Sequence, residues 1–395
     1  MDPERPVPGP PVARADEVGQ RPTRIRVDLD ALSHNLRVLR AHAGVPVMGV
    51  VKANAYGHGL VPVARHLQAQ GVDQLGVAFL EEGVALRRAG ITLPILVMGG
   101  IFGPQAAALI AEDLEITVSS IDKLRQVEAA AEALGRRATI HLKIDTGMER
   151  IGVHSYHAGP FIEAAVASRW CTVKGVYSHL ACSDEPDSPM TARQLARFLE
   201  ACAHFDRLGV PMPIRHLANS GGLLNFPDTR LDLVRPGIAL YGVLPDPDSR
   251  TTLDLRPAMS LLSQVVYFKV VPAGQPVSYG ATWAPAVDTR MVTIPIGYGD
   301  GFPRALSSRG EVLLRGQRRP IAGRICMDQF MADLGPDGTA YNEDEAVLIG
   351  RQGDQGIRCE DVARAAGTIP YEILVGLNTR IPREYFLHGS LVPEA

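Results

Sequence analysis

The sequence predicts an α/β fold, an N-terminal (β/α)8 TIM-type barrel followed by a mainly β C-terminal domain. Short apolar runs, each typical of a strand buried on both faces, alternate with amphipathic stretches over about 200 residues. Eight such runs are present, and polar residues stand at the ends of most of them. Beyond residue 246 strand-like patterns dominate. A doubly wound sheet has the same local pattern, but the count of eight favours the barrel.

The composition is that of an ordinary globular protein. The chain has 395 residues, enough for two or three domains, with 46% apolar and 21% charged residues. The net charge of -3 gives no reason to expect nucleic acid or an anionic membrane as a partner. No apolar run reaches the roughly 18 residues that a bilayer span needs, and the N-terminus carries no apolar signal core. We therefore expect a cytoplasmic protein.

The cysteines give no sign of a structural framework. There are five of them, an odd count, and no two form a C-x-x-C pair. This argues against a disulfide framework and against a zinc ribbon, and no metal site is expected. A reducing cellular compartment is the simpler location for such a protein.

The N-terminal segment changes character near residue 22. Residues 1–22 are rich in proline, small and charged residues, which predicts a disordered tail. Arg24–Asp30 alternates apolar and polar residues like a half-buried strand, and this strand is a plausible contributor to the β domain. Asp30 is then expected to cap a helix over Ala31–Ala41.

The barrel is predicted over residues 23–246. Its predicted strands are Val47–Val51, Gln74–Phe79, Pro94–Met98, Glu115–Val118, Thr139–Ile144, Val173–Tyr177, Ile214–Leu217 and Leu231–Val234, and the amphipathic stretches between them include Leu80–Ala89, Ser120–Leu134 and Thr191–Leu208. The carboxyl ends of all barrel strands face one mouth, where active sites are built. Polar residues at these ends should therefore converge, and they are Lys52, Ser119, Lys143, Asp145, His179, Asn219, Ser220 and Arg235.

The second domain begins after a linker. Pro245–Ser249 has the composition of such a linker, and a mainly β domain is predicted over residues 247–387, followed by a C-terminal tail at 388–395. Its predicted strands are Leu261–Val271, Arg290–Ile296, Glu311–Leu314, Arg319–Ala322 and Ala346–Ile349, and its helical stretches are Cys359–Ala366 and Tyr371–Leu377.

Lys52 is the candidate on which a functional site depends. It follows the first barrel strand where the chain turns polar, a place at which a lone lysine is more often a surface residue. The turn Tyr56–Gly59 adds donors at a chain reversal, where a desolvated lysine could form a Schiff base with a carbonyl compound. Asn219–Gly222 and Gly237–Ile238 offer amides and a hydroxyl for a phosphate. Together they describe a phosphorylated aldehyde held at both ends.

Eight motifs between residues 24 and 386 carry a family resemblance. They are Val51–Gly59, Lys143–Met148 with Arg150, Ala218–Ser220, Val234–Gly242, Ser278–Thr282, Gly297–Gly301, Gly323–Gln329 and Ile369–Glu372. In this order they resemble the motifs of the alanine racemases, enzymes of fold type III that depend on pyridoxal 5′-phosphate (PLP). Only the N-terminal tail lies clearly outside the resemblance.

The resemblance implies a role for each matching residue. Lys52 would hold PLP as a Schiff base and act as the base for one enantiomer of alanine. Tyr279 would be the opposite base and would reach in from a second subunit, and His179 is similar to the histidine that hydrogen-bonds this tyrosine. Arg235 resembles the arginine that contacts the pyridine nitrogen of PLP, with His216 supporting it.

The remaining matches complete the implied site. Lys143 resembles the carbamylated lysine of the family, which pairs with Arg150. The cofactor contacts implied besides Lys52 are Tyr56, His179, His216, Asn219, Ser220, Arg235, Gly237, Ile238 and Tyr371. The substrate contacts implied are Arg150, Met327 and Asp328, the last two from the second subunit.

The resemblance implies a homodimer with shared active sites that interconverts L-alanine and D-alanine and supplies D-alanine for peptidoglycan. Within the enzyme class, the alternatives are another PLP-dependent racemase, such as one acting on serine, or a decarboxylase on the same scaffold. In a different class, the alternative is a non-enzymatic PLP carrier on a similar barrel. Such a carrier has neither a β domain nor a partner tyrosine, and this sequence predicts both.

Overall fold

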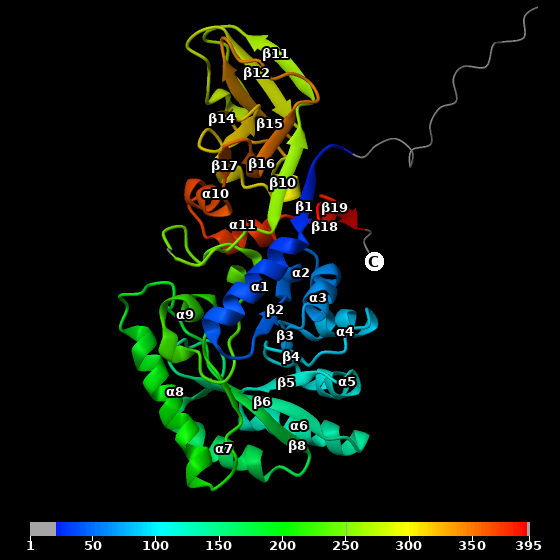
Figure 1. The fold of residues 1–395 in the computed structure, drawn as a ribbon, viewed down its shortest axis with the longest axis vertical. Helices are drawn as coiled ribbons and strands as arrows, with labels where there is room; N and C mark the ends of the chain where they lie inside the picture. Colours follow the sequence, from blue (N-terminus) through cyan, green and yellow to red (C-terminus); the bar gives the residue numbers. More distant parts are fainter. Residues whose placement is uncertain (1–20, 250, 393–395) are drawn as a thin grey trace, which may run out of the picture.

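The computed structural model describes residues 21–249 and 251–392 and consists of an α/β barrel with a β domain stacked on it along the long axis (Figure 1). This architecture confirms the predicted fold class. Most of the predicted N-terminal tail, residues 1–20, lies outside the described residues. Arg21, which the prediction also assigns to the tail, is instead held by an ion pair of 2.6 Å with the buried Asp300.

The barrel sheet contains seven regular parallel strands in sequence order, β2-β3-β4-β5-β6-β8-β9. They are β2 (Met48–Val50), β3 (Gln74–Val77), β4 (Ile95–Val97), β5 (Glu115–Val118), β6 (Ala138–Asp145), β8 (Cys171–Tyr177) and β9 (Ile214–His216), and the two-residue β7 (Val153–His154) pairs with the end of β6. Most of these strands are buried along their whole length, which is why they read as continuous apolar runs.

The eighth predicted strand is wrong as a regular strand. In the segment Leu231–Val234 only Val234 forms a parallel bridge, with Val47. Pro236 follows closely and has no backbone N–H, so a ladder cannot continue there. Two hydrogen bonds still join this segment to β2, from Met48 N to Val234 O (2.8 Å) and from Val50 N to Pro236 O (3.2 Å). The barrel is therefore closed by an extended segment.

Helical segments follow the strands, and the longer ones cover the outside of the barrel (Figure 1). They are α2 (Lys52–Tyr56), α3 (Leu60–Ala69), α4 (Leu80–Arg88), α5 (Ala106–Ala111), α6 (Ile121–Leu134), α7 (Ala158–Ala167), α8 (Met190–Arg207) and α9 (Ser220–Asn225). The predicted amphipathic stretches coincide with α4, α6 and α8 to within one residue.

The first strand and helix connect the two parts of the molecule. β1 (Arg24–Asp28) does not join the barrel but pairs with two strands of the β domain, antiparallel to β10 and parallel to β18. The predicted cap of α1 (Leu29–Ala43) is wrong, because Asp28 is the N-cap and its carboxylate accepts from Ala31 N at 3.0 Å. Asp30 lies in the first turn of this helix, and its carboxylate accepts from His388 N instead.

The β domain is one sheet in the order β11-β12-β15-β14-β13-β16-β10-β1-β18-β19, with β17 beside β16. Its further strands are β10 (Met259–Gln264), β11 (Tyr267–Val271), β12 (Thr289–Ile294), β13 (Glu311–Leu314), β14 (Gln317–Ala322), β15 (Phe330–Gly335), β16 (Glu345–Gln352), β17 (Gln355–Ile357), β18 (Arg383–Leu387) and β19 (Ser390–Val392), and its helices are α10 (Cys359–Ala366) and α11 (Pro370–Gly376). The sequence does not predict β15, β17, β18 or β19.

Two predictions for this domain are wrong in detail. Leu261–Val271 is not one strand, because β10 ends at Gln264 and Val266 N turns to hydrogen-bond Thr293 O at 3.0 Å. The predicted tail at 388–395 contains β19, which pairs with β18 in an antiparallel hairpin. Residues 393–395 lie outside the described residues.

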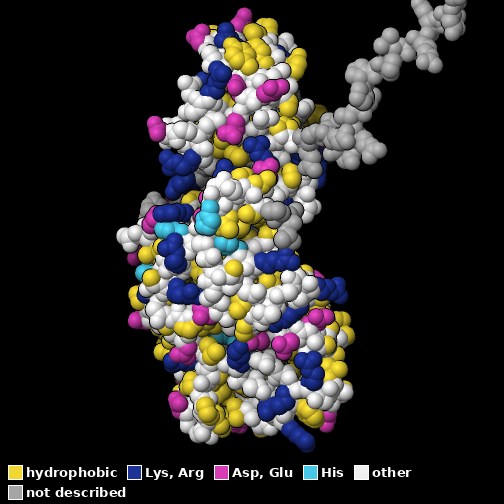
Figure 2. Space-filling view, turned by 45° about the vertical axis from the view of Figure 1, so that its right-hand side comes forward, with side chains coloured by type: hydrophobic (Ala, Val, Ile, Leu, Met, Phe, Trp, Pro, Cys, Tyr) yellow, Lys and Arg dark blue, Asp and Glu magenta, His cyan; other side chains and the backbone are white. Residues whose placement is uncertain are grey.

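One hydrophobic core runs through both parts of the molecule, and the buried side chains of Tyr241 and Tyr385 belong to it. On the face shown in Figure 2, Lys and Arg side chains are spread among Asp and Glu. The five cysteines all lie in the described residues, where they are free thiols. Within residues 21–249 and 251–392, no helix combines the length and apolar content that a membrane span requires.

Candidate active site

A cavity of about 780 Å³ lies at the carboxyl ends of the barrel strands. Ten of the residues singled out in the sequence line it, and they are Lys52, Tyr56, Lys143, Arg150, His179, Asn219, Ser220, Arg235, Gly237 and Tyr371. These residues are far apart in the sequence and come from both parts of the molecule. The parallel arrangement of the strands brings them together, since all strand ends open into the same mouth.

The chain directly after Lys52 has an unusual backbone. Ala53, Asn54, Ala55 and Tyr56 all have φ between 52° and 55°, so the segment α2 is a left-handed turn. Each such residue costs about 1–2 kcal/mol relative to a right-handed turn. The turn is held by hydrogen bonds from Ala53 N to Glu82 Oε1 (2.6 Å) and from Leu60 N to Asn54 Oδ1 (2.8 Å). This turn fixes Lys52 and Tyr56 on the wall of the cavity.

The β domain packs closely against the same turn. A Cβ added at Gly57 would lie 2.3 Å from Leu374 O of α11, so only glycine permits this close approach. Arg383 of β18 donates from Nε to Gly57 O at 2.8 Å. The turn that follows Lys52 is therefore held between the barrel and the β domain (Figure 1).

The charge lining the cavity is strongly positive. Four basic side chains line it, from Lys52, Lys143, Arg150 and Arg235, against one acidic side chain among the described residues, Asp184. Burial, followed by the nearby Arg150, lowers the pKa of Lys52. Burial, followed by Arg235 and Arg150, lowers the pKa of Lys143 well below its ordinary value. The cavity thus favours anionic ligands, and its two amines are biased toward the neutral, nucleophilic form.

Arg235 forms the floor of the cavity and is only 3% exposed. Its Nη1 donates to His216 O (2.7 Å) and lies 3.1 Å from His216 Nδ1, and its Nη2 donates to Ser178 O (2.8 Å). His216 does not line the cavity but lies behind the guanidinium. Burial lowers the pKa of Arg235 to about 10, so the side chain remains a cation at neutral pH.

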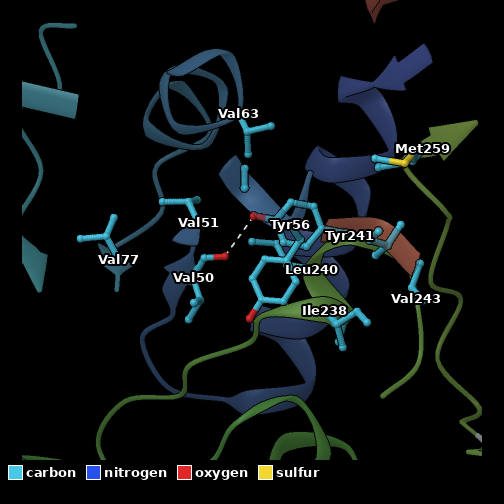
Figure 3. Packing of buried hydrophobic residues seen from close by; sticks show 14 of the residues in the cluster. Val50, Val51, Tyr56, Val63, Val77, Ile238, Leu240, Tyr241, Val243 and Met259 are labelled. Atoms are coloured by element: carbon cyan, nitrogen blue, oxygen red, sulfur yellow. Dashed lines mark hydrogen bonds between the residues drawn. The ribbon is translucent and has the colours of Figure 1, made fainter. Parts of the chain in front are cut away.

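Tyr56, Ser220 and Gly237 lie together on one wall of the cavity. Ser220 Oγ accepts from Gly237 N at 3.0 Å and from Ala239 N at 3.3 Å. A Cβ added at Gly237 would lie 2.1 Å from the Tyr56 hydroxyl oxygen, so glycine leaves the space that this hydroxyl occupies. The Tyr56 ring lies against Tyr241, whose hydroxyl donates to Val50 O at 3.0 Å (Figure 3). This wall offers the hydroxyl groups of Tyr56 and Ser220.

The side chains of Asn219 and Asp145 accept hydrogen bonds from backbone amides near the cavity. Asn219 is the N-cap of α9, and its Oδ1 accepts from Gly222 N at 2.9 Å. Asp145 does not line the cavity, but its carboxylate accepts from the backbone amides of Gly147 (2.8 Å) and Arg150 (3.2 Å). Asp145 therefore shapes the loop that carries Arg150. Ser119, another predicted strand-end residue, does not line the cavity.

Four further residues singled out in the sequence do not line the cavity. Ile238 is fully buried, next to Gly237. Tyr279 and Met327 lie on the surface of the β domain, 68% and 53% exposed. Asp328 forms an ion pair of 2.8 Å with Arg380 there. Within one chain, the structure does not bring these last three residues to Lys52.

Tyr177 lines the cavity although the sequence does not single it out. It ends β8 and is 2% exposed. Lys143 Nζ lies 4.3 Å from the centre of its ring, and the Arg235 guanidinium lies 5.2 Å from it. The face of the Tyr177 ring thus lies against the Lys143 amine and supports the cationic guanidinium of Arg235. Only the position of Tyr177 at a predicted strand end could have indicated that it lines the cavity.

Comparisons with known proteins agree with this geometry. A family profile described as "Alanine racemase, N-terminal domain" matches residues 27–245, and one described as "Alanine racemase, C-terminal domain" matches residues 258–385. The alanine racemase of Thermobifida fusca is 45% identical over 91% of this chain and 97% of its own length. That of Symbiobacterium thermophilum is 43% identical over 93% of this chain and 98% of its own length.

Solved structures show the same relationship. The crystal structure of alanine racemase from D-cycloserine producing Streptomyces lavendulae superimposes with a TM-score of 0.90 at 44% identity, over 93% of this chain and 98% of the other. Alanine racemase from Streptomyces coelicolor gives a TM-score of 0.89 at 41% identity, over 92% and 97% of the two chains. The matching profiles, relatives and fold show that this chain belongs to the alanine racemase family, whose members are amino-acid isomerases.

Proposed function

We propose that the cavity binds PLP through Lys52 and racemises alanine in a homodimer with shared active sites. The observation that carries the proposal is that one cavity is lined by a partly desolvated lysine, by the hydroxyl groups of Tyr56 and Ser220, and by the buried cation Arg235. PLP has an aldehyde, a ring nitrogen and a phosphate, and the cavity offers a matching group for each. Bound there, the cofactor would withdraw electrons and acidify the α-proton of the amino acid.

The phosphate end fits the wall of Tyr56, Ser220 and Gly237. Ser220 is the first residue of α9, and it lies next to Gly237, whose backbone N–H donates to Ser220 Oγ at 3.0 Å. Burial raises the pKa of Tyr56, which keeps its hydroxyl protonated and able to donate to an anion. Tyr371 of α11 lies beside it, with ring centres 6.1 Å apart, and closes the wall from the β domain.

The ring end fits Arg235. Its guanidinium can only donate, and several of its N–H groups are already used by main-chain oxygens of the floor. An arginine facing a pyridine nitrogen holds that nitrogen unprotonated, so the electron withdrawal is weaker than with an acidic residue at this position. We expect this to favour simple proton return over side reactions.

The substrate carboxylate fits the side of the cavity formed by Lys143 and Arg150. Burial, followed by the nearby Arg235 and Arg150, lowers the pKa of Lys143, which favours its neutral, nucleophilic amine. We propose that this amine adds to carbon dioxide and releases a proton to solvent, which gives a carbamate. The resulting anion would pair with Arg150 and aim the guanidinium at a small carboxylate.

Racemisation requires two acid/base groups, one on each face of the reacting carbon. Lys52 supplies one group, and its lowered pKa favours the free amine that accepts a proton. The second group must lie on the opposite face of the reacting carbon. We propose that Tyr279 of a second copy supplies it, close to His179, and that Met327 and Asp328 enter with it. The exposure of Tyr279 and Met327 agrees with such a contact.

Reduction with borohydride tests the link between Lys52 and the cofactor. The purified protein is incubated with PLP and reduced, and its peptides are mapped by mass spectrometry alongside a D-alanine assay. We expect the pyridoxyl mass on the peptide containing Lys52, and its loss with the racemase activity in Lys52→Ala. Lys123→Ala, which changes a lysine of α6 outside the cavity, is the matched control. Label on another lysine in the wild-type protein would contradict the proposal.

A further inference from the structure

A chain of hydrogen bonds runs through the interior of the barrel, from the amino end of β5 to Arg235. It begins at Glu115, the first residue of β5, whose Oε2 lies 2.8 Å from His141 Nε2. His141 Nδ1 lies 2.9 Å from His216 Nε2, and His216 Nδ1 lies 3.1 Å from Arg235 Nη1. All four side chains are buried. The chain connects four different segments of the barrel.

The carboxylate at the start of this chain is held as an anion. Glu115 accepts from Gln74 Nε2 at 2.5 Å through the same oxygen that faces His141, and its other oxygen forms an ion pair with Lys174. Burial alone would raise the pKa of Glu115, but the hydrogen bonds and charges of His141 and Lys174 act against it, and the net shift is downward. Glu115 is therefore ionised at neutral pH.

The two histidines are packed into fixed positions. A Cβ added at Gly175 of β8 would lie 2.3 Å from His141 Nδ1, so glycine leaves the space that this imidazole occupies. The ring of Tyr177 stacks on His216, with ring centres 4.6 Å apart and planes 9° from parallel. The interior of the barrel is therefore shaped around both rings.

Donor and acceptor roles along this chain are determined from both ends. An ionised Glu115 can only accept, so His141 carries its proton on Nε2 and accepts at Nδ1. Arg235 can only donate, so His216 accepts at Nδ1 and carries its proton on Nε2. Both requirements meet in one hydrogen bond, from His216 Nε2 to His141 Nδ1. A second proton on either ring would place two donors face to face, and burial lowers the pKa of both histidines.

We propose that Glu115 and His141 are positioning residues for Arg235, acting through His216 to orient its guanidinium. The three hydrogen bonds all point from Arg235 toward Glu115, and bonds in such a chain polarise one another. The carboxylate thereby strengthens the acceptor that His216 Nδ1 presents to the guanidinium. This role rests on the proposed contact between Arg235 and the ring nitrogen of PLP.

Neutron diffraction of the deuterated holoenzyme tests the proton positions directly. We expect deuterium on Nε2 of His141 and on Nε2 of His216, and none on the Nδ1 atom of either ring. Deuterium on Nδ1 of either ring would reverse or interrupt the chain and would overturn the proposal. This result does not depend on the catalytic activity of the crystals.

A substitution at the far end tests whether the chain acts on Arg235. In Glu115→Gln we expect the 15N resonances of His141 Nε2 and His216 Nδ1 to shift and the Kd for PLP to rise about tenfold, since the terminal acceptor loses its charge. Ser168→Ala, which removes a different buried hydrogen bond, to Cys171 N, is the control and should change neither quantity. Unchanged resonances and Kd in Glu115→Gln would overturn the proposal.

Arg235→Lys separates this inference from the proposed function. A raised Kd in Arg235→Lys together with an unchanged Kd in Glu115→Gln would overturn the positioning role alone. An unchanged Kd in both variants would also overturn the proposed contact of Arg235 with the cofactor. A raised Kd in both, with Ser168→Ala at the wild-type value, is the result that we expect.

Discussion

Replacing Gly237 with alanine should disturb the proposed phosphate wall without touching the catalytic lysine. The added Cβ would lie 2.1 Å from the Tyr56 hydroxyl oxygen, which is roughly 1.5 Å short of ordinary van der Waals contact. The φ of Gly237 is -102°, outside the left-handed region, so the clash is the main effect. Tyr56 is buried against Tyr241 and cannot retreat freely. Overpacking of this kind costs about 1–3 kcal/mol.

Two measurements separate the consequences of Gly237→Ala. Urea unfolding of the cofactor-free protein should show the loss of stability, and a fluorescence titration should show a Kd for PLP raised about tenfold or more, because a hydrogen bond to a charged group contributes about 1.5–3 kcal/mol. Adding Tyr56→Phe removes the nearest clashing atom and leaves Cζ at 2.8 Å. The double variant should therefore regain part of the lost stability but not the affinity for PLP.

Gly356→Ala is a suitable control for this experiment. Its Cβ would meet only ordinary contacts, the nearest at 3.5 Å from Arg351 Cγ, and it lies on β17 of the other domain. If Gly237→Ala matched the wild-type protein in both stability and Kd, the close packing of Tyr56 against Gly237 would be refuted. The proposed phosphate wall would then lose its main structural support.

Three further predictions concern acid stability, the N-terminal ion pair and the shared site. Burial lowers the pKa of His58 from 6.5 to about 4, so between pH 6.5 and 4 only the unfolded chain takes up a proton at this histidine. Urea unfolding should therefore show that the free energy of unfolding falls by about 3 kcal/mol as the pH is lowered through this range. In His58→Gln the free energy of unfolding should depend less on pH over the same range. Arg21→Ala should lower the free energy of unfolding by about 1–3 kcal/mol, because the buried Asp300 loses a partner. Refolded mixtures of inactive Lys52→Ala and Tyr279→Ala should regain about a quarter of wild-type activity, and background activity in hybrids confirmed by mass would contradict a shared site.

The barrel can be predicted from the sequence because buried parallel strands are apolar along their whole length and recur between amphipathic helices. The eighth strand shows the limit of this rule. Leu231–Val234 has the right composition, but the backbone after it, with Pro236, determines that no regular ladder forms. In the β domain, β17 and β19 have three residues each, too few to show an alternating pattern. Each pairs with the strand directly before it, β17 with β16 and β19 with β18, in a short antiparallel hairpin.

The candidate site can be predicted as far as it depends on strand ends and on motifs. Lys52, Lys143 and Arg235 lie where a barrel places its mouth, and the cavity contains all three. Glu115 resembles an exposed charge at the beginning of a strand, yet it is buried and carries three hydrogen bonds. Tyr177 has the pattern of a core residue. In both cases the function of the side chain depends on what lies across the barrel, and no local pattern contains that information.

The two proposed bases share a feature of their backbones that explains how each could be held still. Lys52 precedes four residues with φ between 52° and 55°. Tyr279 lies in a turn in which Ser278 has φ 66° and ψ -178°, a region that is nearly restricted to glycine. Ser278 Oγ donates to Arg324 O at 2.5 Å, which braces this turn while the Tyr279 ring remains 68% exposed. An exposed ring on a strained turn that a hydrogen bond holds in place can contact a partner in one orientation. A base that acts in the neighbouring site requires such a fixed orientation.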